Sequence, residues 1–196
     1  WDIARDIELA TDSSGKVIGY YVLDGYGGVH RAGTAYGVGT TPYWGWDIAR
    51  DLKLIKNSSG NVIGYYVLDG YGGVHRSNTN IKEFSGIPYW GWAIARAIAL
   101  TSDGNGIYVL DGYGGIHRAG NAPEIGNYRF LPYLGVDLSR DIALSSDGSK
   151  IYRLDAQNLT KTQTQTNQPS VFVQMANVLE SAKTILLNML ESLKGQ

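Results

Sequence analysis

Residues 97–118 read AIALTSDGNGIYVLDGYGGIHR, and the organisation of the whole chain can be worked out from this stretch. Apolar residues alternate in two short runs, one on each side of a turn at 102–106. A period of two is typical of a β-strand, and an Asp-Gly turn between two such runs is a strong hairpin signal. The Gly-rich residues 111–115 then predict a tight turn into a third strand. The stretch therefore predicts three short antiparallel strands.

The same pattern recurs along most of the 196 residues. The block WDIARD occupies residues 1–6 and 46–51, and two variants of it follow. Residues 17–31 and 62–76 are identical. Units of about 45 residues with several short strands are typical of repeated β architectures. We expect three full units and a fourth that lacks its outer part, with first strands near 3–9, 48–54, 94–100 and 138–144.

Residues 97–118 resemble the blades of the NHL, YVTN and WD-repeat propeller group, which also pair an apolar strand, an Asp-Gly turn and a second apolar strand. The order of Gly-Trp, apolar strand, turn and Tyr-rich strand also resembles tachylectin-type lectin propellers. The resemblance covers residues 1–158 and implies a mainly β, propeller-like repeat domain. The WD dipeptide and GH signature of true WD repeats are absent, and a β-solenoid or another β-repeat is the alternative.

Four units are few for a closed propeller, which usually has 4–8 blades. The chain could form a four-bladed ring, complete a larger ring with a second chain, or be the C-terminal piece of a longer repeat protein. Because Trp1 begins inside a repeated motif, we expect a processed or truncated start.

Composition excludes several classes of function. There is no cysteine, so disulfides and thiolate metal sites are excluded. The formal net charge is −1, which gives no support to nucleic-acid binding. No apolar run approaches the ~18 residues of a transmembrane span. The Tyr-, Gly- and Thr-rich makeup is compatible with an extracellular or cell-surface protein, and we expect that location.

The C-terminal part has a different pattern. Residues 159–168 are polar and predict a linker or an edge strand. Residues 169–196 predict an amphipathic helix, because apolar residues follow spacings of three and four. The wide apolar stripe favours three or more copies of the helix, as in a coiled coil or bundle, over a pair, with a helical partner or this chain's own sheets as alternatives. The stripe contains Phe172, Met175, Leu179, Ala182, Leu186, Met189 and Leu193.

Repeated polar residues predict structural roles. An arginine on an otherwise apolar strand needs a partner, since an unpaired buried charge is costly. We therefore expect ion pairs between two repeated sets, Arg5, Arg50, Arg96 and Arg140 with Asp24, Asp69, Asp111 and Asp155. Three equivalent histidines on separate units would not converge on a metal, and we predict no metal and no cofactor.

Aromatic residues are the best functional candidates. Clustered Trp and Tyr beside glycines can form stacking platforms for sugars or protein anchors. The leading prediction is a non-enzymatic structural or adhesive module that assembles through its blades and C-terminal helix. A multivalent lectin-like propeller that binds glycans is the alternative, and an enzyme with a central-channel site is weaker. The candidate ligand-binding residues are Tyr26, Tyr71, Tyr113, Trp44, Trp90, His30, His75 and His117.

Overall fold

The computed structural model describes residues 3–126 and 131–156. The chain divides into two compact units, Trp1–Gln157 and Asn158–Gln196, and every described residue belongs to the first. The linker predicted at 159–168, and the predicted helix with its apolar stripe, lie outside the described residues. Within residues 3–126 and 131–156, no helix has the length and apolar character needed to cross a membrane.

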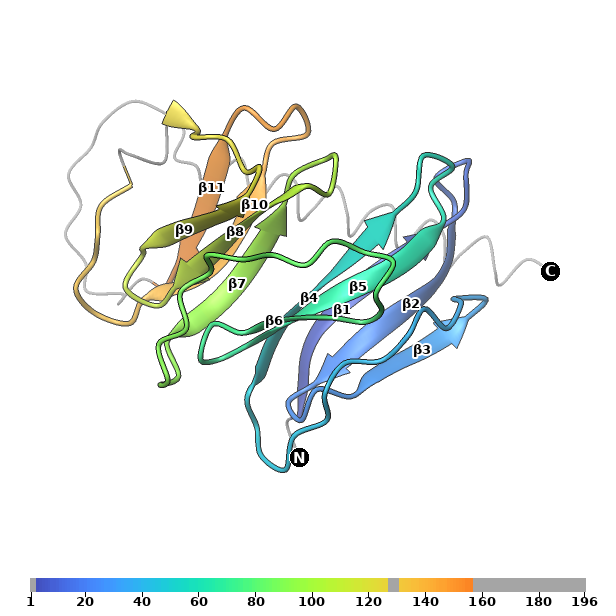
Figure 1. Ribbon diagram of the computed structural model, residues 1–196, viewed down its shortest axis with the longest axis horizontal. Helices are drawn as coiled ribbons and strands as arrows, with labels where there is room; N and C mark the ends of the chain where they lie inside the picture. Colours follow the sequence, from blue (N-terminus) through green and yellow to red (C-terminus); the bar gives the residue numbers. More distant parts are fainter. Residues whose placement is uncertain (1–2, 127–130, 157–196) are drawn as a thin grey trace, which may run out of the picture. The chain divides into compact units, whose positions relative to one another are not determined.

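The described unit is mainly β, as the sequence predicts, and consists of four small antiparallel sheets that follow one another in chain order (Figure 1). Neighbouring strands in each sheet are consecutive in the chain, and the first strand of each sheet begins one residue after the start of its predicted window. The first sheet contains β1 (Ala4–Thr11), β2 (Val17–Asp24) and β3 (Val29–Gly33), and the second contains β4 (Ala49–Lys56), β5 (Val62–Asp69) and β6 (Val74–Arg76). The third contains β7 (Ala95–Leu100), β8 (Gly106–Asp111) and β9 (Ile116–Gly120), and the fourth has two described strands, β10 (Ser139–Leu144) and β11 (Ile151–Asp155).

Each first strand contains a β-bulge at its arginine. Ala4 pairs with Asp24 and Asp6 pairs with Leu23, so Arg5 has no partner in the ladder. The same register shift occurs at the equivalent positions of β4, β7 and β10. A bulge redirects a side chain and interrupts the alternation of faces. The arginine side chains therefore do not follow the alternation that places every second residue of the strand on the apolar face.

The core lies between successive sheets. We call the face of a sheet that packs on the preceding sheet its N-face, and the face that packs on the following sheet its C-face. Leu52 and Tyr65 on the N-face of the second sheet form one cluster with Tyr21 and Leu23 on the C-face of the first. The third sheet packs in the same way on the second, and the fourth packs on the third.

Backbone hydrogen bonds also join successive repeats. The carbonyl of Gly25, in the first Gly-rich turn, accepts hydrogen bonds from the backbone N–H groups of Ile48 and Ala49 at 2.8 and 2.9 Å. Gly70 and Gly112 make the same contacts to the start of the third and fourth units. Each repeat is thus hydrogen-bonded to the repeat that follows it in the chain. The four sheets are each open, and closure into a propeller ring stays a prediction.

Candidate functional site

Each Gly-rich turn is organised by the carboxylate of its aspartate. Asp24 Oδ1 accepts hydrogen bonds from the backbone N–H groups of Tyr26 and Gly28, at 2.8 and 2.9 Å. Its Oδ2 lies 2.7 Å from His30 Nε2. Burial raises the pKa of Asp24, but the hydrogen bonds from His30, Gly28 and Tyr26 together outweigh this effect. The pKa of Asp24 therefore lies below its usual value. The equivalent pairs are Asp69 with His75, at 2.7 Å, and Asp111 with His117, at 2.8 Å.

The repeated arginines have different partners from those predicted. Arg5 Nε donates to Asp47 Oδ1 at 3.1 Å, and Arg96 Nε donates to Asp137 Oδ1 at 3.1 Å. In each case the aspartate belongs to the next repeat and precedes its first strand. Hydrogen bonds from these arginines outweigh partial burial and lower the pKa of both carboxyl groups.

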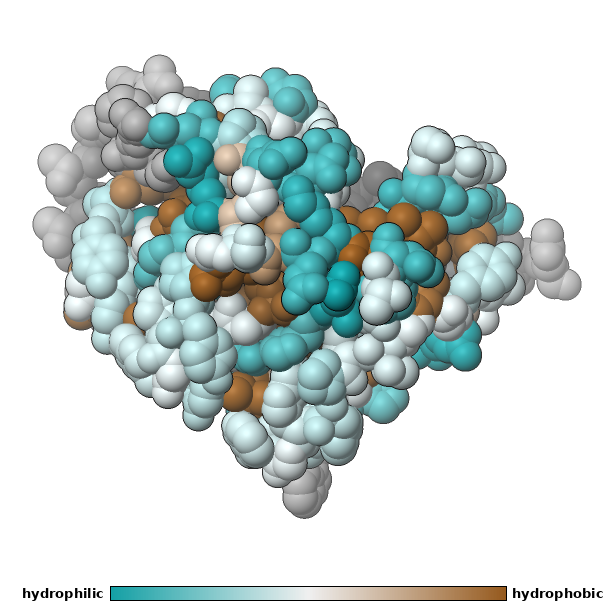
Figure 2. Space-filling view, viewed as in Figure 1, coloured by the Kyte–Doolittle hydropathy of each residue, from teal (hydrophilic) through white to brown (hydrophobic). Residues whose placement is uncertain are grey.

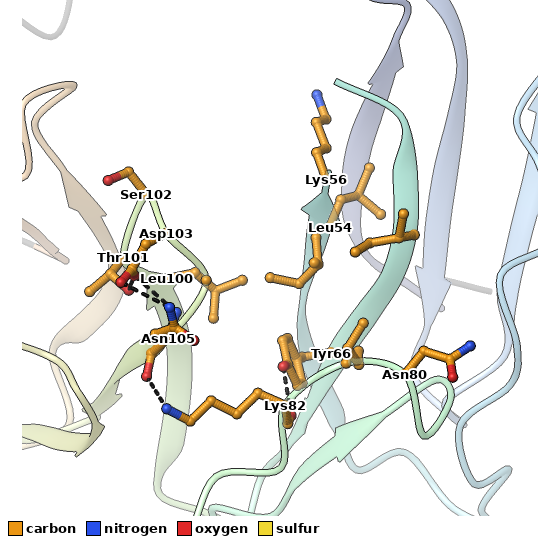
Figure 3. A pocket seen from close by; sticks show the side chains of 14 residues that line it. Leu54, Lys56, Tyr66, Asn80, Lys82, Leu100, Thr101, Ser102, Asp103 and Asn105 are labelled. Atoms are coloured by element: carbon orange, nitrogen blue, oxygen red, sulfur yellow. Dashed lines mark hydrogen bonds between the residues drawn. The ribbon is translucent and has the colours of Figure 1, made fainter. Parts of the chain in front are cut away.

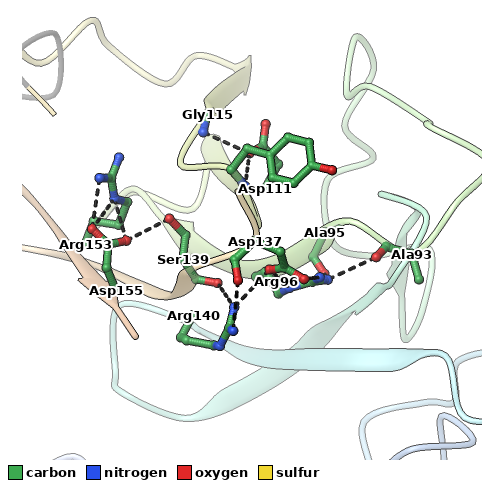
Figure 4. A network of polar contacts seen from close by, with 11 residues as sticks. Ala93, Ala95, Arg96, Asp111, Gly115, Asp137, Ser139, Arg140, Arg153 and Asp155 are labelled. Atoms are coloured by element: carbon green, nitrogen blue, oxygen red, sulfur yellow. Dashed lines mark hydrogen bonds and ion pairs between the residues drawn. The ribbon is translucent and has the colours of Figure 1, made fainter. Parts of the chain in front are cut away.

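The predicted pairing with the turn aspartates therefore does not describe this structure. Arg5 and Arg96 leave the ladder at their bulges and bind an aspartate of the next repeat, whereas the turn aspartate is held by its own turn and histidine. Arg50 donates to Asp47, three residues before it, at 3.2 Å. Arg140 donates to Asp137 in the same way, at 2.9 Å (Figure 4).

In the fourth repeat an arginine, Arg153, lies beside the aspartate in place of a histidine. Asp155 accepts hydrogen bonds from Ser139 Oγ at 2.7 Å and from Arg153 Nε at 2.8 Å (Figure 4). Arg153 also donates to the carbonyls of Gly114 and Pro132, both at 3.0 Å. One buried guanidinium thus occupies the place that a histidine and a tryptophan share at the other junctions.

Both candidate tryptophans, Trp44 and Trp90, fill junctions between repeats. The ring centroid of Trp44 lies 5.0 Å from that of His75 in the next unit, and Trp90 lies 5.0 Å from His117. Trp44 is held from the other side by a 2.7 Å hydrogen bond from its backbone N–H to the Tyr26 carbonyl. These tryptophans are half-buried, which fits a packing role better than a ligand platform.

Other aromatic side chains remain exposed beside these junctions. Tyr43 and Tyr89 have exposed fractions of 71% and 67%. Each lies over a half-buried turn tyrosine, with centroid distances of 6.1 Å to Tyr26 and 6.1 Å to Tyr71. The third turn tyrosine, Tyr113, contacts both of its exposed neighbours, at 5.9 and 6.0 Å. We call the exposed set the aromatic edge: Tyr43, Trp46, Tyr89, Trp92 and Tyr133.

A charged cluster lies between the first and second sheets. Lys53 Nζ donates to Asp51 Oδ1 at 2.8 Å and lies 3.5 Å from Asp6 Oδ2 and 3.1 Å from Glu8 Oε1. Burial raises the pKa of Asp51 well above its usual value, although Lys53 opposes this shift. Asp6 Oδ2 also accepts the backbone N–H of Leu52 at 3.0 Å. The cluster is therefore a bridge between repeats.

A cleft of about 440 Å³ opens between the hairpins β4–β5 and β7–β8 (Figure 3). Apolar surface is visible where these hairpins separate (Figure 2). Its two lysines already have partners, since Lys56 Nζ lies 2.9 Å from Thr11 Oγ1 and Lys82 Nζ lies 2.8 Å from the Asn105 carbonyl. On the opposite wall, Thr101 and Asn105 hydrogen-bond to Asp103 within their own turn.

The described part of the chain has no group of three His, Asp or Glu side chains arranged to hold a metal. Family models, curated proteins and solved structures were compared with the chain, and none matches it. Fold and site together define a class: a mainly β protein of repeated small sheets with an aromatic edge along its junctions.

The residues that the sequence prediction missed follow a simple spacing. Asp47 and Asp137 each lie three residues before a repeated arginine. The third unit has Ala93 at this position, and Arg96 there donates to the Ala93 carbonyl at 3.3 Å. This spacing is a sequence signal for the partners of Arg50 and Arg140, but it does not indicate that the same aspartates also bind Arg5 and Arg96 of the preceding repeats.

Proposed function

We propose that the described unit is a non-enzymatic adhesive module that binds its target through several equivalent contacts along the aromatic edge. The observation that carries this proposal is the exposure of large aromatic side chains at equivalent positions of successive repeats. Exposed aromatic side chains give large contact areas at low cost in conformational entropy. The proposed location is outside the cell or at its surface.

The aromatic edge is well supported from beneath. The loop before each new repeat is tied to the preceding turn by one backbone hydrogen bond, from Trp44 to Tyr26, Trp90 to Tyr71 and Leu134 to Tyr113, at 2.7, 2.8 and 2.7 Å. A surface that is already ordered loses less entropy on binding. Linked sites of modest affinity also gain strength through effective concentration.

A non-enzymatic role is supported by how the repeated polar groups are used. The His–Asp pairs occur in three near-equal copies, and one oxygen of each aspartate holds the backbone of its own turn. A catalytic centre requires groups with different roles in one place. Three structural copies of one pair do not have that arrangement.

Carbohydrate is the second candidate for the bound surface, favoured by one specific observation. Trp46 is 54% exposed and immediately precedes Asp47, a half-exposed carboxylate that is held by two arginines. An aromatic face beside fixed charged groups can stack on a sugar ring and bind its hydroxyl groups.

The experiment measures binding of the full chain to arrays of glycans and of immobilised extracellular proteins. A variant with Tyr43→Ala, Tyr89→Ala and Tyr133→Ala should lose at least a hundredfold in apparent affinity, and single variants much less. Tyr36→Ala is the matched control, because Tyr36 is equally exposed but lies outside the aromatic edge. Glycan binding supports the second candidate, and protein binding supports the first. A triple variant that binds like the wild type refutes both.

A further inference from the structure

The junctions inside the chain define one repeated mode of packing. At every junction between described sheets, the N-face of one sheet covers the C-face of the sheet before it. A tyrosine and a leucine recur on the covered C-faces, and both are fully buried in the first three sheets. They are Tyr21 and Leu23, Tyr66 and Leu68, and Tyr108 and Leu110.

The face of the first sheet that is equivalent to the N-faces of the later sheets, which we also call its N-face, has the same chemistry but is exposed. Ile7 is 57% exposed, whereas its equivalent in the second sheet, Leu52, is 0% exposed. Leu9, Val17 and Tyr20 on this face are also exposed. No sheet among the described residues covers this face. It is an apolar surface shaped like those that are buried at the three internal junctions.

The face of the fourth sheet that is equivalent to the C-faces of the earlier sheets, which we also call its C-face, is exposed in a corresponding way. Tyr152 and Leu154 are 37% and 39% exposed, whereas their equivalents Tyr108 and Leu110 are both 0% exposed. Ala143 is exposed as well, in the place of the buried Ala99. The two ends of the series therefore present the two halves of one interface that the chain already forms three times.

Polar groups at the two ends fit the same interface. At the first junction Asp6 Oδ2 accepts the backbone N–H of Leu52, and at the second Asp51 Oδ2 accepts that of Ile98, at 3.0 and 2.6 Å. Asp141 is the equivalent aspartate in the fourth sheet and is exposed. The backbone N–H of Ile7 would be its counterpart on a docked first sheet.

We propose that the N-face of the first sheet docks on the C-face of the fourth sheet of a second copy of this chain. The interface is head-to-tail, because two different faces meet, and it continues the packing between internal repeats. Such an interface closes a ring if the rotation allows and otherwise extends. This inference is independent of the proposed adhesive function, because neither terminal face includes a residue of the aromatic edge.

The test uses the full chain and two charge substitutions at exposed positions, Ile7→Asp and Leu154→Asp. Sedimentation should give an assembly for the wild type and a single-chain mass for each variant alone. An equimolar mixture of the two variants should recover a 1:1 complex, since each retains the face that the other has lost. Val136→Asp is the control, because Val136 is 54% exposed in a loop outside both faces. Circular dichroism should find all variants equally folded.

Three outcomes would overturn the proposal. A monomeric wild type would exclude docking of a second copy. Variants that keep the wild-type mass would place self-association elsewhere, for example in residues 169–196. Variants that are monomeric but do not complement each other would indicate a symmetric interface between like faces. None of these outcomes alters binding through the aromatic edge, so the two proposals fail separately.

Discussion

Replacing Gly27 with alanine should cost more stability than the same change at Gly15, and should release the loop that holds Trp44. Both glycines have a positive φ, 90° at Gly27 and 83° at Gly15. A Cβ at Gly15 meets nothing within 4 Å, whereas one at Gly27 would lie 2.3 Å from Trp44 Cζ3 and 2.6 Å from the Pro42 carbonyl oxygen. The pair of substitutions therefore separates backbone strain from the close approach of the tryptophan.

The expected magnitudes follow from these two contributions. A left-handed conformation costs an L-residue roughly 1–2 kcal/mol, and this should be the whole effect of Gly15→Ala. Overpacking adds about 1–3 kcal/mol, so Gly27→Ala should lower the free energy of unfolding by about 2–5 kcal/mol. Urea denaturation followed by circular dichroism measures the difference as a shift in midpoint.

A double-mutant cycle with Trp44→Ala tests the cause. With the indole removed, much of the excess cost of Gly27→Ala should disappear, leaving backbone strain and the Pro42 contact. A coupling of at least about 1 kcal/mol is expected for residues in direct contact. Equal costs at Gly15 and Gly27, or additive effects of Gly27→Ala and Trp44→Ala, would refute the reasoning.

Three further predictions concern the polar network. Asp69→Ala removes the carboxylate that accepts hydrogen bonds from Tyr71, Gly73 and His75. It should lower the free energy of unfolding, measured by urea or heat, by about 2–4 kcal/mol. Asp103→Ala, in an exposed hairpin turn, should cause a smaller loss. Because the folded-state pKa of Asp137 lies below 3.8, its contribution to stability is present above pH 3.8 and is lost as the pH falls through the lowered value. Arg96→Gln should therefore move acid unfolding to higher pH, and an unchanged acid midpoint would contradict the ion pair. Lys53→Met leaves the buried Asp51 without its cation and should cost about 3 kcal/mol at pH 7. Since the pKa of Asp51 is raised, the variant's stability should fall as the pH rises above 3.8, and equal losses at pH 5 and pH 8 would contradict this account.

The strands and turns could be predicted from the sequence because their causes are local. Alternating apolar residues and turns that contain Asp or Asn together with Gly determine the hairpins, and these features are local in the sequence. The arginine partners could not be predicted by the same reasoning. They depend on a bulge, which becomes visible only when Ala4 and Asp6 are paired with β2, and on an aspartate contributed by another repeat.

Burial at the two ends of the series could not be read from local sequence either. Residues 17–31 and 62–76 are identical, yet Tyr20 is 42% exposed and its counterpart Tyr65 is 4% exposed. The two segments have the same sequence, so the difference in exposure arises because the first sheet packs on Tyr65 and no described sheet packs on Tyr20. The half-buried state of the turn tyrosines has a similar origin, because exposed residues such as Tyr43 and Tyr89 pack over them from the following loop.

The hydrogen bonds from Ile48 and Ala49 to the carbonyl of Gly25 have a consequence for folding on the ribosome. The first Gly-rich turn obtains these donors only when the opening of the second unit has been synthesised and has left the exit tunnel. Trp44, in the loop that follows the first unit, likewise packs against His75, which is synthesised about 30 residues later. Each repeat therefore completes its contacts only after the next repeat has been synthesised. A pause in translation within one unit prolongs the time for which the apolar surface of the preceding unit is exposed to solvent.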